Sequence, residues 1–255
     1  GDITGAIVAR CLDADLYENW TDVSGFLSAD PRIVQNPRAI GRITFDEMRE
    51  LSYMGASVLQ EEAIFPVREA NIPIQIKNTN RPEDTGTVIR ETADGDTNEH
   101  LITGIAGKKD FLAIHVKKAH MSNEVGVISR ALNIVERYGV SVEHIPTGVD
   151  SFGIVVNASD VKDTVYSIIS DIRREIEPDD ITMVDRLALV SVVGRNMSRR
   201  SGTSGKIFGA LGNAGVNIRM ITQSSEEISI IVGVDNADFD RTIGVIYNGF
   251  VRDEM

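Results

Sequence analysis

Hydrophobic and polar positions in residues 1–90 follow helical and strand periods in turn. Near the start, apolar side chains fall on one face of a predicted helix: Ile3, Ile7, Val8 and Leu12. The single cysteine, Cys11, falls on the same face, so we expect it to be buried. Beyond this helix the pattern predicts strands at 16–23, 73–79 and 87–90 and helices at 44–55 and 60–70. Such alternation is typical of an α/β domain whose sheet is largely buried.

Two local signals refine this part of the chain. Thr44 precedes an apolar-periodic segment and Glu47 follows three residues later, a pattern that predicts a capping box at a helix N-terminus. Residues 24–42 are predicted to form a loop. The stretch 91–100 is polar, contains glycine and has no period, which is typical of a linker. We therefore place the first domain at 1–90 and a linker at 91–100.

The rest of the chain contains an internal repeat. Two pairs of segments match in pattern, 111–116 with 187–192 and 138–156 with 214–232. The offset is 76 residues, as seen for Gly139 against Gly215. Each copy is predicted to run strand, loop, helix ending at a glycine, two strands in a hairpin, and a second helix. In the first copy a closing strand completes a ferredoxin-like βαββαβ unit.

The second copy has no segment of its own for that closing strand. Its last helix is followed only by "FVRDEM", and an open sheet edge would expose unpaired backbone groups. The leftover segment 101–107 lies just before the first copy. We predict that it pairs into the second copy, so that a domain at 108–186 is inserted within a domain formed by 101–107 and 187–255.

Charge and composition narrow the range of partners. The chain has 255 residues and a net charge of −12 at pH 7, which repels nucleic-acid backbones and anionic membranes. No apolar run is long enough to span a bilayer, and the N-terminus lacks the order of a signal peptide. One cysteine permits no internal disulfide, which is typical of a cytoplasmic protein. The chain opens without methionine, so we expect it to be part of a longer protein.

Four stretches carry a family resemblance, in one order and spacing: "GDITGA", "WTDVSGFLSADPRIV", "ITFDEMRELSYMGASVL" and "NIPIQIKNT". They resemble the carboxyl half of the aspartokinase catalytic domain. The repeat resembles the two ACT regulatory domains that follow it in that family. The resemblance covers the whole chain and implies part of an amino-acid-kinase α/β domain followed by two ferredoxin-like domains. It also implies that the front half of the kinase domain precedes Gly1, so we expect the chain alone to be inactive.

The resemblance implies a reaction and a set of site residues. Aspartokinases transfer the γ-phosphoryl group of ATP, bound with Mg²⁺, to the side-chain carboxylate of L-aspartate, on the route to lysine, threonine and methionine. Asp2 matches the residue that helps to hold the substrate's amino group. The positions that match the family's ATP-contacting residues are Thr21, Asp22, Leu27, Arg32 and Ser57. Leu27 stands where the family often has tyrosine, and Ser57 where it usually has a lysine, with Gln60-Glu61 in place of His-Pro.

The same residues also fit plainer interpretations. Without the resemblance, Asp22 and Arg32 would suit an ion pair within a loop, and Asp30-Pro31 is an ordinary turn signal. The segment "SGTSGKI" at 201–207 fails the phosphate-loop pattern, because Arg200 replaces its first glycine and Ile207 follows its lysine. The four histidines lack the spacing of a zinc site, so no metal site is predicted in the protein itself.

A candidate effector site lies in the first copy. Residues 119–129 form a strand-to-helix loop, where backbone amides at a helix N-terminus suit a carboxylate. Glu143, an acidic residue on an otherwise apolar strand, could pair with an ammonium group, although it also suits a solvated strand. In lysine-sensitive aspartokinases an acidic residue matches Glu143. The resemblance implies a lysine site formed by Met121, Glu124, Gly126, Val127, Ile128, Ser141, Val142, Glu143, Thr147 and Gly148.

These residues lead to one main hypothesis and one alternative. The main hypothesis is an aspartokinase inhibited by L-lysine, whose ACT domains pair in a homo-oligomer with the effector at their interface. Arg219 stands in the second copy where the first has Glu143, so we predict no lysine site there. The alternative is a non-catalytic regulatory subunit that binds an amino acid through its ACT domains.

Overall fold

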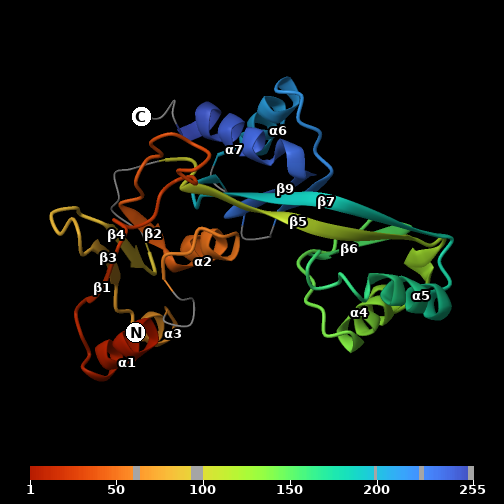
Figure 1. Cartoon of the computed structure of the whole chain (residues 1–255), viewed down its shortest axis with the longest axis horizontal. Coiled ribbons are helices and arrows are strands. Elements are labelled where there is room, and N and C mark those ends of the chain that lie inside the picture. The colour runs from red at the N-terminus through yellow and green to blue at the C-terminus, as the bar shows by residue number, and fades with distance from the viewer. Residues whose placement is uncertain (60–63, 93–99, 198–199, 224–226, 252–255) are drawn as a thin grey trace.

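The computed structural model describes residues 1–59, 64–92, 100–197, 200–223 and 227–251. Gln60, Glu61, most of the predicted linker and the last four residues lie outside the described residues. Within them, the strands form a four-stranded sheet in the order β1-β3-β4-β2 and a five-stranded sheet in the order β6-β5-β7-β9-β8. Figure 1 shows the smaller sheet at the N-terminal end of the molecule and the larger sheet extending away from it.

The N-terminal part follows the alternation expected from the sequence. Its elements are α1 (Asp2–Cys11), β1 (Tyr17–Thr21), β2 (Arg42–Thr44), α2 (Phe45–Tyr53), α3 (Ile64–Glu69), β3 (Ile74–Asn78) and β4 (Thr87–Arg90). β1 is parallel to β3 and β2 is parallel to β4. The capping box at Thr44 is confirmed, because its hydroxyl accepts from the Glu47 amide and the Glu47 carboxylate accepts from the Thr44 amide.

The prediction for the first helix was wrong about its buried face. The side chains expected to face the core are substantially exposed: Ile3, Ile7, Val8 and Leu12. Cys11 is exposed as well. α1 packs instead through small residues, with Ala6 and Ala9 buried. A side chain at Gly5 would come within 2.8 Å of the Tyr17 hydroxyl, so the helix approaches β1 along its smallest residues.

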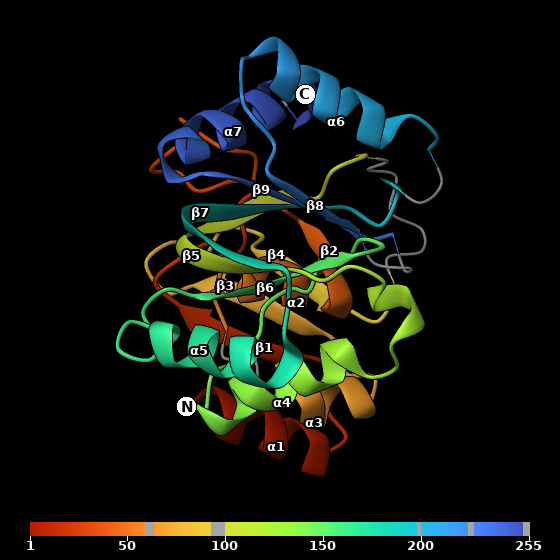
Figure 2. The ribbon, with the colours of Figure 1, turned by 90° about the vertical axis from the view of Figure 1, so that its right-hand side faces the viewer.

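The C-terminal part contains two long strands and the helices that cover them. Its elements are β5 (Gly104–Lys117), α4 (Val127–Arg137), β6 (Ser151–Asn157), α5 (Val165–Ile176), β7 (Asp180–Val193), α6 (Thr203–Asn213), β8 (Met220–Gln223), β9 (Ser229–Asp235) and α7 (Phe239–Ile246). Short 3₁₀ turns precede α4 and α7, and a π-helix spans Tyr247–Val251. In Figures 1 and 2, α6 and α7 lie on one side of the larger sheet and α4 and α5 on the other.

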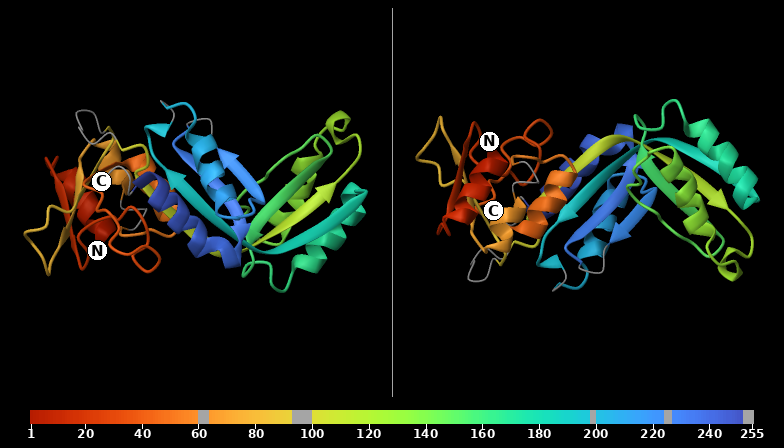
Figure 3. Two further views of the ribbon diagram at one scale, coloured as in Figure 1. Left: turned by 90° about the horizontal axis from the view of Figure 1, so that it is seen from above. Right: turned by 90° about the horizontal axis from the view of Figure 1, so that it is seen from below.

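β5 and β7 each join segments that the sequence predicts as separate strands. Figures 1 and 3 show both as long ribbons shared by the two helix-covered ends of the sheet. The pairing is irregular between Lys108 and Phe111, and Asp110 and Arg186 have positive φ of 67° and 52°. On the N-terminal side of this irregularity, β5 pairs with β7, beginning with Gly104 opposite Val193. On its C-terminal side, β5 lies between β6 and β7 and pairs with both. We propose these two ends as the two predicted domains, one at 108–186 and one formed by 101–107 and 187–255.

The first copy also departs from the predicted hairpin. The segment 141–148 forms only isolated bridges to β6, from His144 to Val155 and from Thr147 to Phe152. Pro146 has no N–H to donate, which interrupts a regular ladder. The second helix of this copy, predicted from about 160, begins at Val165. The segment 141–148 therefore lies along the outer edge of the sheet without forming a regular strand. Backbone hydrogen bonds still hold it to β6, including those from the Glu143 amide to the Val155 carbonyl at 2.8 Å and from the Gly153 amide to the Pro146 carbonyl at 2.8 Å.

Glycines at equivalent positions of the repeat end α4 and α6. Gly139 and Gly215 have φ of 68° and 71°, and a side chain at either would meet nothing within 4 Å. We expect Gly139→Ala and Gly215→Ala each to lower the free energy of unfolding by about 1 kcal/mol, because only the backbone conformation is penalised. Gly212→Ala, inside α6, should raise it by about 0.5–1 kcal/mol. Urea unfolding followed by circular dichroism measures the free energy of unfolding of all three variants. A change in the same direction for all three would contradict the assignment of Gly139 and Gly215 as helix ends.

Candidate functional site

One candidate site lies at the carboxyl end of β1. Thr21 pairs in register with Asn78 of the parallel strand β3, and its carbonyl accepts from the Thr79 amide at 2.8 Å. The Thr21 hydroxyl donates to a carboxylate oxygen of Asp22 at 3.3 Å. Asp22 is exposed. Carboxyl ends of parallel strands are where α/β proteins bind ligands, so these polar side chains lie at an edge of the sheet that suits a ligand.

The loop that follows is held at its base and exposed at its tip. The Phe26 amide donates to the Thr87 hydroxyl at 2.8 Å, and Phe26 itself is buried. Gly25 has φ of 103°, and a side chain there would come within 2.2 Å of that hydroxyl. Leu27 is partly exposed and bridges to Ala39. The base of the loop is therefore fixed, whereas Asp22 and Arg32 are exposed to solvent.

Arg32 is paired within this loop, but its partner is Asp30 rather than Asp22. Its guanidinium donates to both Asp30 oxygens, at 2.6 Å to Oδ2 and at 3.0 Å to Oδ1. The hydrogen bond from Arg32 holds the pKa of Asp30 below its usual value. The Arg32 side chain is 88% exposed, so the same guanidinium can still receive an anion from solvent.

Asp2 is positioned by two residues that sequence reasoning missed. Its carboxylate accepts from the Asn19 amide at 3.2 Å, and its backbone carbonyl accepts from the Tyr17 hydroxyl at 3.1 Å. Asn19 also donates to the Tyr17 hydroxyl at 3.1 Å and is buried. The structure was needed to find them, because β1 contains several polar residues and the sequence does not show that Asn19 is the buried one. Ser57 lies apart from this group, and its hydroxyl donates weakly to the Leu59 carbonyl at 3.4 Å.

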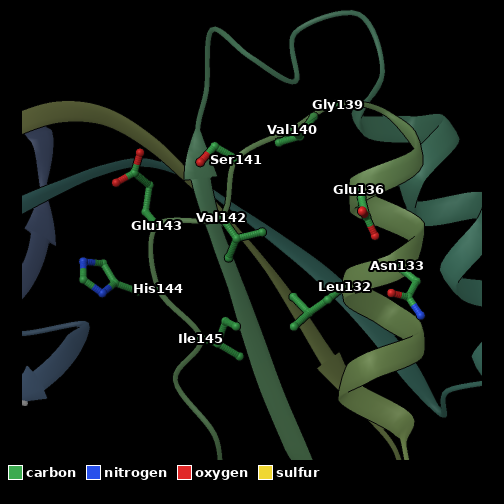
Figure 4. A pocket seen from close by; sticks show the side chains of 10 residues that line it. All are labelled: Leu132, Asn133, Glu136, Gly139, Val140, Ser141, Val142, Glu143, His144 and Ile145. Carbon is green, nitrogen blue, oxygen red and sulfur yellow. The ribbon is translucent and has the colours of Figure 1, made fainter.

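The second candidate site is a hollow of about 680 Å³ beside α4. It is lined by Leu132, Asn133, Glu136, Gly139, Val140, Ser141, Val142, Glu143, His144 and Ile145. Figure 4 shows Val142 and Leu132 pointing toward each other, whereas Glu143 and His144 point away from α4. Of the residues predicted for the lysine site, this hollow brings together Ser141, Val142 and Glu143.

The other predicted lysine-site residues lie outside this hollow. Met121 and Val127 are buried in the core beneath α4, and Ile128 packs against that core. Glu124 pairs with Arg130 and, at 3.2 Å, with Lys118, and its hydrogen bond from Lys118 lowers its pKa. Gly126 begins α4 with φ of 82°. Thr147 and Gly148 are exposed at the turn before β6.

His144 is a further residue of the hollow that sequence reasoning missed. Burial lowers its pKa from the usual value of 6.5, against the opposing charge of Glu143. The unfolded chain therefore takes up a proton at higher pH than the folded chain. The neutral His144 side chain therefore contributes to the stability of the fold above pH 6.5. That contribution is lost as the pH falls through the pKa that His144 has in the folded chain.

We expect His144→Gln to lose less stability than the wild type between about pH 7 and 5, because the neutral glutamine has no proton to take up. His115→Gln, at an exposed position of β5, should behave as the wild type does. Urea unfolding at each pH measures the effect. The same pH dependence in His144→Gln and the wild type would show that His144 does not carry it.

A buried polar cluster joins the N-terminal part to the larger sheet. The Glu47 carboxylate, fully buried in α2, accepts from the Arg195 guanidinium at 3.0 Å and from the Thr103 hydroxyl at 2.6 Å. Nearby, the Arg38 guanidinium donates to the Ile102 carbonyl at 2.9 Å. The Arg38 amide also donates to the Tyr247 hydroxyl at 3.0 Å. The two parts are therefore joined by directional contacts as well as by apolar packing.

The described part of the chain lacks two kinds of feature. Among those residues, no group of three or more His, Cys, Asp and Glu side chains could hold a metal ion. Within the same ranges, no helix combines the length and apolar character needed to cross a membrane.

In the second copy, Arg219 lies 3.6 Å from the Asp235 carboxylate.

Comparison with known proteins relates both parts of the chain to one family. The amino acid kinase family matches residues 1–78, and an ACT domain family matches residues 190–250. Aspartokinase 3 of Bacillus subtilis is 41% identical over 250 residues, which are 98% of this chain and 55% of that protein. The chain spans about half the length of the curated relatives it matches.

Solved structures agree with the sequence comparison. Aspartate kinase of Clostridium acetobutylicum is 51% identical with a TM-score of 0.94, covering 98% of this chain and 57% of that one. E. coli aspartokinase III, in complex with lysine and aspartate, is 25% identical with a TM-score of 0.80, covering 98% and 55%. The fold class predicted from the sequence is confirmed. By sequence and by fold, this chain belongs to the aspartokinase family, with an amino-acid-kinase segment followed by an ACT region.

Proposed function

We propose that the protein to which this chain belongs phosphorylates the side-chain carboxylate of L-aspartate with ATP, forming 4-phospho-aspartate. The observation that carries this proposal is the exposed polar loop after β1, in a chain 51% identical to an aspartate kinase of known structure. The reaction requires positioning and neutralisation of charge more than covalent help from the protein. Thr21 and Asp22 provide a hydroxyl and a carboxylate at the carboxyl end of β1, and Arg32 provides a guanidinium in the loop that follows.

Each site residue has a role that suits its chemistry. Asp2, held by Asn19 and Tyr17, would accept a hydrogen bond from the amino group of aspartate. Arg32 would face the phosphates, for which a guanidinium is well shaped. Mg²⁺ would come with the nucleotide and neutralise phosphate charge. The serine hydroxyl at position 57 supplies no cation, so Arg32 is the residue of the described loop that would carry that role.

Replacing Arg32 tests this proposal. In the protein that contains this chain, Arg32→Ala should slow aspartyl phosphate formation about tenfold or more, because an exposed cation at the phosphates is lost. Arg173→Ala removes an exposed arginine from α5 and should leave the rate unchanged. Trapping the product as hydroxamate measures both rates. Equal rates for Arg32→Ala and Arg173→Ala would remove Arg32 from the site.

We also propose L-lysine as the effector, with Glu143 as the partner of its side-chain ammonium. The hollow beside α4 supplies an apolar wall from Leu132 and Val142 for the methylene groups. The segment 141–148 lies along the outer edge of the sheet beside β6, and an outer edge is available to a second copy of the chain, which supports a homo-oligomer. E. coli aspartokinase III has been solved in complex with lysine, which supports the choice of ligand.

A second candidate is a non-catalytic regulatory subunit that binds an amino acid. It is favoured by one observation, that the hollow beside α4 is formed entirely within this chain. The two candidates differ in one measurable property. A regulatory subunit would bind lysine without any aspartate-dependent hydroxamate, whereas an aspartokinase would show both.

A further inference from the structure

A contact between two distant parts of the chain reaches the candidate effector site. Tyr53, the last residue of α2, donates its hydroxyl to Glu143 Oε2 at 2.5 Å. The two residues are 90 positions apart, one in the amino-acid-kinase part and one in the edge segment 141–148. The residue proposed to bind the effector's ammonium is therefore already hydrogen-bonded to the N-terminal part.

Tyr53 is held in place from the side of β5. The Lys108 ammonium lies 5.2 Å from the centre of the Tyr53 ring. Two residues later, a side chain added at Gly55 would lie 3.6 Å from the Gly107 carbonyl, so the end of α2 packs closely on β5. The other end of α2 is fixed by Glu47, through Thr103 and Arg195. The hydroxyl of Tyr53 thus approaches Glu143 from a well-supported helix.

The Glu143 carboxylate points away from the hollow while it accepts the hydrogen bond from Tyr53. In Figure 4 its carboxylate points away from Leu132, Asn133 and Glu136, the α4 residues that line the hollow. A carboxylate that neutralises an ammonium group in the hollow would have to turn toward α4. It would then leave the Tyr53 hydroxyl. The Glu143 backbone stays fixed, because its amide donates to the Val155 carbonyl of β6 at 2.8 Å, so the movement is a rotation of the Glu143 side chain alone.

We propose that Tyr53 and the ammonium group of bound lysine compete for the Glu143 carboxylate, which makes Tyr53 a latch between the effector site and α2. This inference rests on the proposed lysine site. A ligand's charge is a stronger partner for a carboxylate than a neutral phenol, so lysine wins the competition at sufficient concentration. Lysine binding then releases the last turn of α2. The lysine-free and lysine-bound states differ in the hydrogen bond between Tyr53 and Glu143.

The test uses the 255-residue chain and four variants. Tyr53→Phe keeps the ring over Lys108 and removes only the hydroxyl. Tyr166→Phe, at an exposed position of α5, is the matched control. Glu143→Gln removes the charge that lysine needs, and Glu177→Gln removes an exposed carboxylate elsewhere. Lysine is titrated into each by calorimetry, and hydrogen exchange is followed in the α2 peptide.

We expect Tyr53→Phe to bind lysine about five- to tenfold more tightly than the wild type, because a competing hydrogen bond to a charged group is gone. Tyr166→Phe should bind as the wild type does. Lysine should speed exchange at the end of α2 in the wild type. In Tyr53→Phe, exchange there should already be fast and should not respond to lysine.

Two results would overturn the latch while leaving the lysine site intact. Unchanged affinity in Tyr53→Phe, with weakened binding in Glu143→Gln, would show that Tyr53 does not compete. Weaker binding in Tyr53→Phe would show that the hydroxyl orients the carboxylate for lysine instead. Absence of lysine binding to the folded wild-type chain would overturn the lysine site and the latch together.

Discussion

Glu47→Leu is expected to lower the free energy of unfolding by about 3–5 kcal/mol, a large fraction of the stability of an ordinary domain. The carboxylate is fully buried and accepts from Arg195 at 3.0 Å, from the Thr103 hydroxyl at 2.6 Å and from the Thr44 amide at 3.1 Å. Leucine removes these contacts at once, together with those from the Arg195 amide at 2.9 Å and the Thr44 hydroxyl at 3.2 Å. It also leaves the mostly buried Arg195 guanidinium without this carboxylate, which is the costly part of breaking a buried pair.

Chemical denaturation of the chain measures this effect, with Glu50→Leu on the same helix as the control. The control should change stability by less than about 0.5 kcal/mol, as expected away from such contacts. Glu47→Leu combined with Arg195→Met should recover part of the loss, because both charges are then removed. Similar stabilities for Glu47→Leu and Glu50→Leu would show that the cluster does not join the two parts of the molecule.

Glu143→Gln is expected to weaken lysine binding by about 30-fold or more, the second large effect. A charge pair contributes far more than a neutral amide at this position, and losing one partner typically costs at least 2 kcal/mol. Glutamine keeps the size of the side chain, so the hollow beside α4 retains its shape. Glu177→Gln should leave lysine affinity unchanged, since that residue lies at the exposed end of α5.

Calorimetric titration with lysine, threonine and methionine measures the affinity and the choice of ligand together. Lysine affinity equal in Glu143→Gln and the wild type would remove Glu143 from the site. Stronger binding of threonine or methionine than of lysine would reassign the effector.

Local signals in the sequence predicted local structure well. The Thr44–Glu47 capping box depends on four consecutive residues and is confirmed. The helix ends at Gly139 and Gly215 follow from the conformational freedom of glycine. By contrast, the apolar face of α1 was recognised but assigned to the core, because periodicity finds a face without showing what covers it. The small residues Gly5, Ala6 and Ala9 set how α1 packs.

The candidate sites were predictable only where their residues are close in sequence or match the family. Thr21 ends β1, Asp22 and Arg32 lie in the segment that follows it, and their match to the family's motif suggested a site. The contacts of Glu47 with Arg195 and of Tyr53 with Glu143 join residues 148 and 90 positions apart. Nothing in the local pattern pairs them, because each depends on how α2 packs against β5 and β7. Tertiary structure was needed to find both.

Formation of aspartyl hydroxamate, measured over a range of lysine concentrations in the protein that contains this chain, tests the central claim most directly. We predict product that depends on both ATP and aspartate, that falls as lysine rises, and that no longer responds to lysine in Glu143→Gln. Absence of aspartate-dependent product, or product that lysine leaves unchanged in the wild type, would contradict the account.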